Sequence, residues 1–339
     1  MNLSSSDSRV TASVLDTVGV IYEAYDAYRS RFPETDDAYR RRRERLLGLL
    51  MRGLSGIDGA TRQEALFVLG RRVFGSGELG RHEKRRAFML TQRKLLSAQD
   101  EFPGEGLTFY YRAAMLGKLY RFITEERLFH KGFDFGVPRP VAFFPGTFDP
   151  FTLSHKGIVR AIRDQGFEVL LAIDEFSWSK KTQPYRLRRR IAAMAVADVF
   201  HVSIFPEDFP VNIANPENLH ELRAAFPGRS VSIVVGSDVV AHASSYQKPV
   251  EPDSIHTFDH IIFRRPGQEA GGGYGGIYGK VLELTLPEPL EEISSTRIRE
   301  AVDANRDISN LVDPAVQEFI YRRGLYLREP QDKPLLRTE

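Results

Sequence analysis

Residues 145–155 read PGTFDPFTLSH and carry groups that suit the binding of a phosphate. Gly146 and Thr147 can bring their backbone close to a ligand, because Gly has no Cβ that would clash with it. The hydroxyl of Thr152 and the imidazole of His155 can each donate a hydrogen bond to a phosphate oxygen. A helix that begins next to His155 would add unpaired backbone N–H groups and the positive end of its dipole. The stretch therefore predicts a phosphate site.

A second polar cluster lies near the end of the chain, where residues 293–299 read ISSTRIR. Ser294, Ser295 and Thr296 are typical of a helix start, where a hydroxyl accepts from the first unpaired N–H groups. Arg299 follows at helical spacing, and its planar fork can meet a phosphate with two hydrogen bonds. Together with the upstream stretch, this cluster predicts a site for the β- and γ-phosphates of a nucleotide.

Both clusters need secondary-structure elements that hold them together. Each follows a short apolar run that reads as a buried strand, and runs of this kind alternate with helical patterns from residue 141 onward. Such alternation predicts right-handed βαβ units and a Rossmann-like α/β domain with a parallel sheet, whose ligands bind at the carboxyl ends of the strands. The strand candidates are 141–144, 167–173, 199–205, 231–235, 259–264 and 281–286.

The first 136 residues show a different pattern, with apolar residues at helical spacing throughout. They predict an all-α helical domain, which a Gly- and Pro-rich linker at 132–140 connects to the nucleotide-binding part. The expected domains are thus 1–136, helical, and 137–330, which holds both polar clusters. The five predicted helices are 14–32, 36–54, 61–74, 81–100 and 107–129.

Composition narrows the class of protein. A chain of 339 residues is long enough for two domains, and its net charge is only +2. With no cysteine, disulfides and thiolate metal sites are excluded, and no apolar run approaches the roughly 20 residues of a membrane span. We expect a cytoplasmic protein without a membrane partner. The arginines at 40–43 and 45 are interpreted as an exposed helix face, so nucleic acid is not an expected partner.

The two clusters resemble the signatures of the nucleotidyltransferase superfamily of the HxGH/TxGH type. Residues 146–155 are similar to its G-[ST]-F-[DN]-P-x-[HT]-x-G-H motif, with Ser154 in place of the usual Gly, and residues 293–299 match its I-S-S-T-x-I-R motif. Residues 311–326 are similar to the C-terminal tail of the nicotinate/nicotinamide mononucleotide adenylyltransferases. The resemblance covers residues 139–327.

This resemblance implies roles for further residues. Phe148 and Asp149 belong to the first signature and would contribute to the ATP site, where His155, Thr152 and Arg299 would be the catalytic groups. Residues on the acceptor side would be Lys180 and Lys181, which correspond to a Lys-rich loop, and Arg190, which follows the loop and is expected to open a helix at 191–198. Gly236 and Asp238 correspond to a strand end that binds ribose or base. The family often has a Trp after that Asp. This chain has none there, so Tyr246 and Trp178 are the candidates for stacking on the acceptor ring.

The resemblance implies transfer of AMP from ATP to nicotinate or nicotinamide mononucleotide (NaMN or NMN), with Mg²⁺ accompanying ATP and pyrophosphate released, as in NAD synthesis. Two alternatives stay open: transfer of a nucleotidyl group to another acceptor, such as a phosphopantetheine- or FMN-like phosphate, and a non-catalytic nucleotide sensor. The expected partners are ATP and the mononucleotide. For the helical domain, oligomerisation and contact with another protein are both open.

Overall fold

The computed structural model describes residues 8–32, 34–56, 59–101, 119–126, 128–129, 138–174, 182–206, 211–264, 274–287 and 289–327, with the side chains of 8–12 and 96–101 left aside. The chain divides into two compact units. The first comprises residues 1–138 together with 196–203, and the second comprises residues 139–195 and 204–339.

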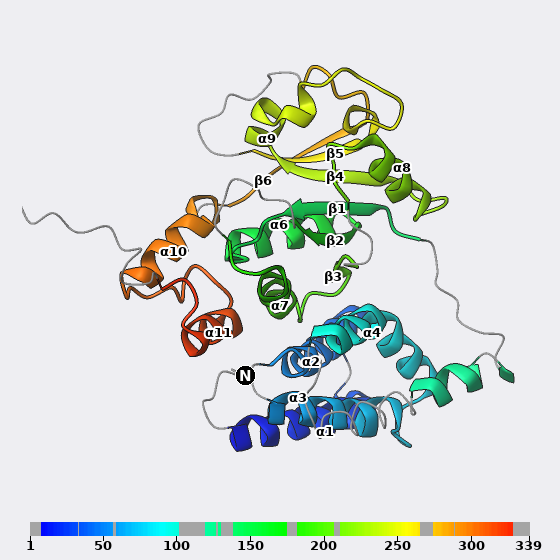
Figure 1. Cartoon of the computed structure of the whole chain (residues 1–339). Helices are drawn as coiled ribbons and strands as arrows, with labels where there is room; N and C mark the ends of the chain where they lie inside the picture. Colours follow the sequence, from blue (N-terminus) through cyan, green and yellow to red (C-terminus); the bar gives the residue numbers. More distant parts are fainter. Residues whose placement is uncertain are drawn as a thin grey trace, which may run out of the picture. The chain divides into compact units, whose positions relative to one another are not determined.

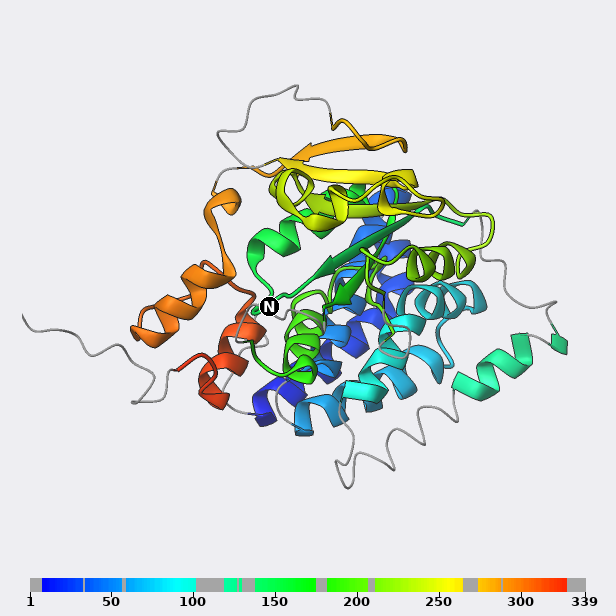
Figure 2. The ribbon, with the colours of Figure 1, turned by 45° about the horizontal axis from the view of Figure 1, so that its top comes forward.

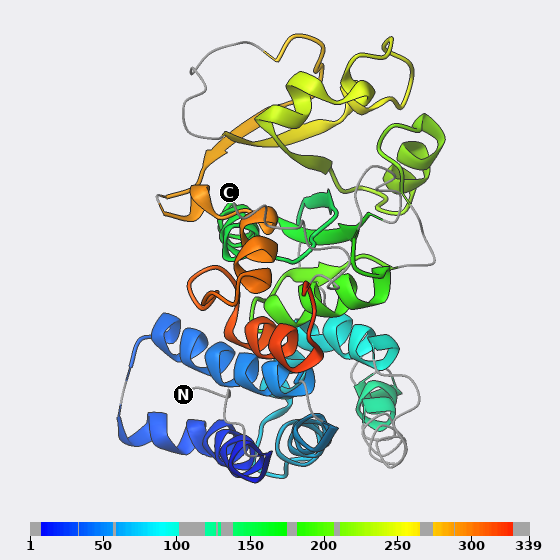
Figure 3. The ribbon, with the colours of Figure 1, turned by 60° about the vertical axis from the view of Figure 1, so that its left-hand side comes forward.

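The first unit contains the helices that the apolar periodicity predicts. Thr35 caps α2, since its hydroxyl accepts from the N–H of Ala38 at 3.2 Å. Helix α3 continues into a π-helical segment, so the predicted helix 61–74 is regular only in its first part. Of the predicted helix 107–129, residues 119–126 and 128–129 are described and helical. The helices are α1 (Ser8–Arg31), α2 (Asp36–Leu54), α3 (Gly59–Val68), the π-helix Leu69–Phe74 and α4 (Arg81–Glu101) (Figure 3).

One arginine of the basic run on α2 departs from the expected exposed face. Arg43 is only 2% exposed, whereas its neighbours in the run are exposed. Its guanidinium lies 4.3 Å from the centre of the Tyr22 ring and 3.1 Å from the Glu83 carboxylate. Because a buried guanidinium needs such compensation, Arg43 belongs to the interior of the helical unit.

The second unit is built on a six-stranded sheet in the order β3-β2-β1-β4-β5-β6, of which Val202 and Ser203 on β3 group with the first unit (Figure 1). The register places Phe143 opposite Leu170 on β2 and opposite Ile233 on β4, both in parallel pairings. This order reverses direction between β1 and β4, which is the point where doubly wound sheets bind ligands. The predicted fold class is confirmed. The strands are β1 (Val141–Gly146), β2 (Glu168–Ile173), β3 (Val202–Ile204), β4 (Val231–Gly236), β5 (Asp259–Arg264) and β6 (Val281–Thr285).

The core of the second unit follows from alternation along the strands. Val141 and Phe143 on β1 and Ile233 on β4 lie in one buried apolar cluster with Leu219 and Leu222 of α8. Residues between them point to the opposite face because side chains alternate along a strand. The helices are α6 (Leu153–Asp164), α7 (Tyr185–Ala195), α8 (Pro216–Ala224), α9 (Ser237–His242), α10 (Ser295–Asp303) and α11 (Pro314–Arg323).

Several element boundaries differ from the predicted ones, and two of the differences have a visible cause or bear on the site. Strand β3 begins at Val202 instead of residue 199, since His201 has a left-handed backbone at φ 61° and residues before it form a turn. Helix α7 runs from Tyr185 to Ala195 instead of 191–198, so Arg190 lies inside the helix and does not open it. In all three ribbon views α11, in red, lies beside α7, in green (Figure 2). No described helix is long and apolar enough to cross a membrane.

Candidate active site

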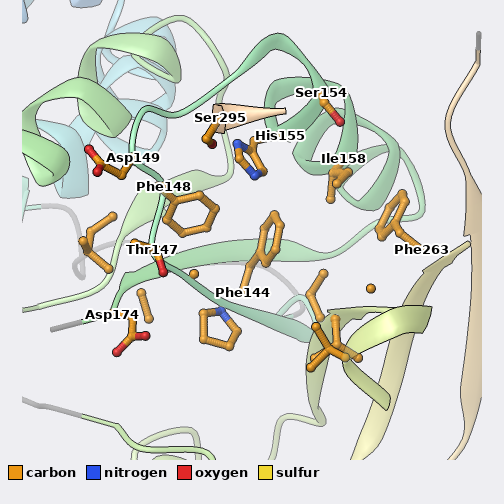
Figure 4. Close-up of a pocket in the computed structure, with 18 of the residues that line it drawn as sticks. Phe144, Thr147, Phe148, Asp149, Ser154, His155, Ile158, Asp174, Phe263 and Ser295 are labelled. Atoms are coloured by element: carbon orange, nitrogen blue, oxygen red, sulfur yellow. The ribbon is translucent and has the colours of Figure 1, made fainter. Parts of the chain in front are cut away.

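A cavity of about 850 Å³ opens at the carboxyl ends of β1 and β4. Its position agrees with the rule that open α/β sheets bind ligands where the strand order reverses. Eleven of the predicted site residues line it, and they come from both polar clusters and from the junction of β4 and α9. Figure 4 labels Thr147, Phe148, Asp149, His155 and Ser295 among them. They are Gly146, Thr147, Phe148, Asp149, His155, Gly236, Asp238, Ser294, Ser295, Thr296 and Arg299.

His155 is held at the start of α6 by a reciprocal cap. The N–H of His155 donates to the Thr152 hydroxyl at 3.1 Å, and the N–H of Thr152 donates to Nδ1 of His155 at 3.0 Å. Since Nδ1 is the acceptor, the neutral imidazole carries its proton on Nε2. The ring also packs edge-on against Phe148 with centroids 5.0 Å apart. The cap thus fixes both the orientation of the ring and the nitrogen that can donate.

The loop before α6 is tied to the rest of the unit by Asp149, whose side chain is buried. Its Oδ1 accepts from the hydroxyl of Tyr326 at 2.7 Å, and its Oδ2 accepts from the N–H of Gln183 at 3.2 Å. Burial raises the pKa of Tyr326, and the nearby Asp149 charge raises it further, so the hydroxyl stays protonated and acts as donor. Asp149 therefore links the first signature to the tail of the chain.

The second signature meets the first directly. Ser294 caps α10 by accepting from the N–H of Arg297, as the sequence predicts. The hydroxyl of Ser295 donates to the carbonyl of Pro150 at 2.9 Å. Arg299 donates to the carbonyl of Asp149 at 2.6 Å and to the Thr296 hydroxyl at 3.1 Å. Two segments about 150 residues apart in the chain thus form one wall of the cavity.

The junction of β4 and α9 contributes Gly236, the last residue of the strand, and Asp238, in the first turn of the helix, to the cavity wall. A Cβ atom on Gly236 would lie 2.4 Å from Oδ1 of Asp238, closer than real contacts allow. Only glycine leaves this carboxylate in its place. The resemblance suggested a functional pair at this strand end, and the close approach gives a physical reason for the glycine.

Several predicted site residues do not line the cavity. Thr152 is 1% exposed and acts as the cap of α6. The guanidinium of Arg190 lies 4.6 Å from the centre of the Phe319 ring on α11. Tyr246 is packed in the core, with its hydroxyl 2.9 Å from Nε2 of His260. Trp178, Lys180 and Lys181 lie outside the described residues.

Two arginines that the sequence motifs do not indicate lie beside the cavity. Arg188 donates to the carbonyl oxygens of Thr147, at 2.7 Å, and Gln183, and Arg189 donates to that of Phe205 at 2.8 Å. Both are less than a tenth exposed. They therefore join α7 to the segments that follow β1 and β3. The run of three arginines at 188–190 was the only available signal, and it does not show which of them point inward.

The fit of a divalent ion can be judged from the carboxylates present. The described residues contain no group of three or more side chains arranged to hold a metal. Mg²⁺ usually keeps several waters and binds one or two carboxylates together with substrate phosphates. Asp174, at the end of β2, lines the cavity and is such a carboxylate (Figure 4). The site thus suits an ion that arrives with a triphosphate.

Residues 143–301 match the family model of the cytidylyltransferase-like proteins. This range contains both signatures and most of the sheet. The predicted nucleotidyltransferase superfamily and class of enzyme are confirmed for this part of the chain.

Two curated relatives refine the comparison. The "Probable nicotinate-nucleotide adenylyltransferase" of Corynebacterium kroppenstedtii is 27% identical over 199 residues, which cover 55% of this chain and 90% of the relative. The protein of the same name from Mycolicibacterium vanbaalenii is 28% identical over 209 residues, covering 56% and 94%. A little over half of this chain is therefore similar in sequence to most of each of these adenylyltransferases.

Among solved structures, a nicotinic acid mononucleotide adenylyltransferase of Plasmodium falciparum, complexed with NaAD, has 17% sequence identity. The superposition covers 56% of this chain and 97% of the other, with a TM-score of 0.47.

Proposed function

We propose that this chain transfers AMP from ATP to a pyridine mononucleotide, NaMN or NMN, and releases pyrophosphate. The observation that carries the proposal is the meeting of the two signatures in one cavity, where Arg299 contacts the loop that leads to His155. The names of the curated relatives support the acid form, NaMN, as the first acceptor to test.

In the proposed reaction, an oxygen of the acceptor phosphate attacks the α-phosphorus of ATP. A bond forms between that oxygen and the α-phosphorus, while the bond from the α-phosphorus to the bridging oxygen breaks and pyrophosphate leaves. The protein needs to align two anions and to stabilise charge as it develops. His155 would donate from Nε2 to an oxygen of the α-phosphate, and the N-terminus of α6 would face the same group.

Arg299 would bind the β- and γ-phosphates from the start of α10, together with Ser294, Ser295 and Thr296. Its position beside the first signature supports this role, since both phosphate-binding groups line the same cavity. Mg²⁺ carried by ATP would supply charge neutralisation for the leaving pyrophosphate, and Asp174 is the carboxylate placed to hold it.

For the acceptor we propose Gly236 at the end of β4 and Asp238 in the first turn of α9, with Asp238 accepting from a ribose hydroxyl or a base amine. An aromatic side chain is also needed to stack on the pyridine ring of the acceptor. Trp178, with Lys180 and Lys181, remains a proposal from the sequence. Tyr246 is not on the cavity wall, whereas Phe144, Phe205 and Phe263 are, and these rings offer stacking surface.

The proposal is tested by measuring pyrophosphate release from ATP and Mg²⁺ with NaMN, NMN, FMN and phosphopantetheine. CTP replaces ATP in a parallel series, because the matching family model is cytidylyltransferase-like. We expect ATP with a pyridine mononucleotide to react, and mass spectrometry should identify NAD or its deamido form. Reaction with FMN or phosphopantetheine alone would overturn the pyridine assignment. Nucleotide binding without turnover on any acceptor would favour the sensor.

A further inference from the structure

A junction of four side chains lies beneath the proposed ATP site. Asp149 is 3% exposed and Tyr326 is 8% exposed, and the two are joined by a 2.7 Å hydrogen bond. Arg188 and Arg299 both contact the same short loop. One carboxylate and two guanidinium groups are thus gathered at the phosphate end of the cavity.

The hydrogen-bond partners of Asp149 and of the two arginines differ from those expected when a carboxylate lies near guanidinium groups. A buried carboxylate next to arginines would normally form an ion pair, often with two parallel hydrogen bonds. Here both oxygens of Asp149 accept from neutral donors, the Tyr326 hydroxyl and the N–H of Gln183. The two guanidinium groups instead donate to carbonyl oxygens, those of Thr147 and of Asp149 itself.

Because the arginines are not paired with the carboxylate, their capacity to bind a polyphosphate is affected. An arginine paired with a carboxylate has its charge compensated and its fork occupied, so it binds phosphate less well. Arg188 and Arg299 each donate to two neutral acceptors, so each keeps its full charge and the rest of its five N–H donors. The Tyr326 hydroxyl holds Oδ1 of the Asp149 carboxylate, and Arg299 donates to the backbone carbonyl of the same residue.

We propose that Tyr326 is a positioning residue of the ATP site, which holds the Asp149 carboxylate so that Arg299 stays available to the phosphates. This inference rests on the proposed function, because it assigns Arg299 to ATP. It adds a role for the C-terminal segment, whose side chain at 326 does not itself line the cavity.

The test is the affinity for a non-hydrolysable ATP analogue with Mg²⁺, measured by calorimetry. Tyr326→Phe removes only the hydroxyl and leaves the ring in place. We expect the dissociation constant to rise about tenfold, since Asp149 loses a neutral donor and recruits the guanidinium. The matched control is Tyr321→Phe on α11, whose ring is 48% exposed, and this variant should bind like the wild type.

A double-mutant cycle separates this role from a merely structural one. In an Asp149→Asn background no carboxylate competes for Arg299, so adding Tyr326→Phe should change the dissociation constant less than about twofold. An equal loss in both backgrounds, or no loss from Tyr326→Phe alone, would overturn the inference. If the single variant Tyr326→Phe does not fold, the double variant is compared with Asp149→Asn alone. A dissociation constant about fivefold higher in the double variant would contradict the inference.

The same measurement separates failure of this inference from failure of the proposed function. A wild-type protein that binds no ATP analogue overturns the proposed function and this inference with it. A wild type that binds, with Tyr326→Phe unchanged, overturns the role of Tyr326 alone.

Discussion

At the scale of single residues, His155 both caps a helix and lines the cavity. Its Nδ1 accepts from the N–H of Thr152 and completes the cap of α6. The same contact leaves Nε2 as the donor nitrogen of the neutral ring. A substitution at this position therefore changes two things that must be measured separately.

We expect His155→Ala to lower turnover by about two to three orders of magnitude, the scale of losing one donor to the transition state. It should also destabilise the fold by about 1 kcal/mol through loss of the cap. His155→Asn keeps an acceptor near the position of Nδ1 but has no Nε2 donor. This variant should melt close to the wild type and be as inactive as His155→Ala. Near-normal turnover in either folded variant would remove His155 from the chemistry.

At the scale of elements, α6 and α11 are joined by a buried ion pair. Nζ of Lys156 lies 2.7 Å from Oδ2 of Asp313, and both side chains are less than 5% exposed. Oδ1 of Asp313 also accepts from the N–H of Ala315 and caps α11. The main chain adds a second link, since the N–H of Leu153 donates to the carbonyl of Leu311 at 2.9 Å. The C-terminal segment thus supports the helix that carries His155.

Lys156→Met should lower the free energy of unfolding by about 3–5 kcal/mol, because Asp313 loses its cationic partner while it stays buried. Lys156→Met combined with Asp313→Asn should recover part of this loss, since the neutral amide can still cap α11. Urea unfolding of the three proteins measures both effects. Equal stability of Lys156→Met and the wild type would show that the pair contributes little.

The strand β5 carries a second buried titratable group. His260 is 1% exposed, and burial lowers its pKa to about 4 from 6.5. Between these two pH values the unfolded chain binds a proton that the folded chain does not. Stability therefore falls as the pH falls from about 6.5 to about 4, by about 2–3 kcal/mol. Nδ1 lies 2.9 Å from the carbonyl of Phe258, which fits a neutral ring that donates there.

The pH dependence is measured by urea unfolding at a series of pH values. His260→Gln should flatten the curve over this range, because glutamine does not titrate. His242→Gln is the matched control, since His242 is an exposed residue of α9. An unchanged slope in His260→Gln would mean that other groups cause the acid sensitivity.

At the scale of the whole molecule, one segment complicates the expected division into 1–136 and 137–330. Residues 196–203 group with the helical unit. Within that unit Phe200 belongs to the apolar core, and Nζ of Lys94 donates to the carbonyl oxygens of Val196 and Val202 at 2.7 and 2.9 Å. Arg52 forms an ion pair with Asp198 at 2.9 Å. A fragment without the helices keeps this segment but loses these partners.

We expect residues 137–339 alone to bind ATP with an affinity close to that of the full chain, because every cavity residue lies within them. Their melting temperature should be lower, since Phe200 loses its apolar surroundings. Calorimetry and thermal melting of the fragment and the full chain test both statements. An insoluble fragment would mean that the helical unit is needed for folding.

Sequence patterns alone predicted the sheet and the two motifs. Six apolar runs predicted six strands. The polar residues at 146–155 and 294–299 predicted which strand ends and helix starts form the candidate site. These features depend on neighbours in the sequence. Period-2 and period-3.6 burial, turn chemistry and helix capping all act over a few residues, so a single chain reveals them.

Only the tertiary structure decided which groups meet across the chain. Arg188, Asp149 and Tyr326 come together although they are far apart in sequence, and nothing in their local patterns indicates it. The same holds for Arg43, whose burial within a basic run follows from the packing of α1, α2 and α4 around it. Tyr246 follows Asp238 in the segment where a stacking ring was expected, but its partly buried side chain packs against the apolar core. The direction of a side chain depends on the elements packed against it, and a local pattern does not contain that information.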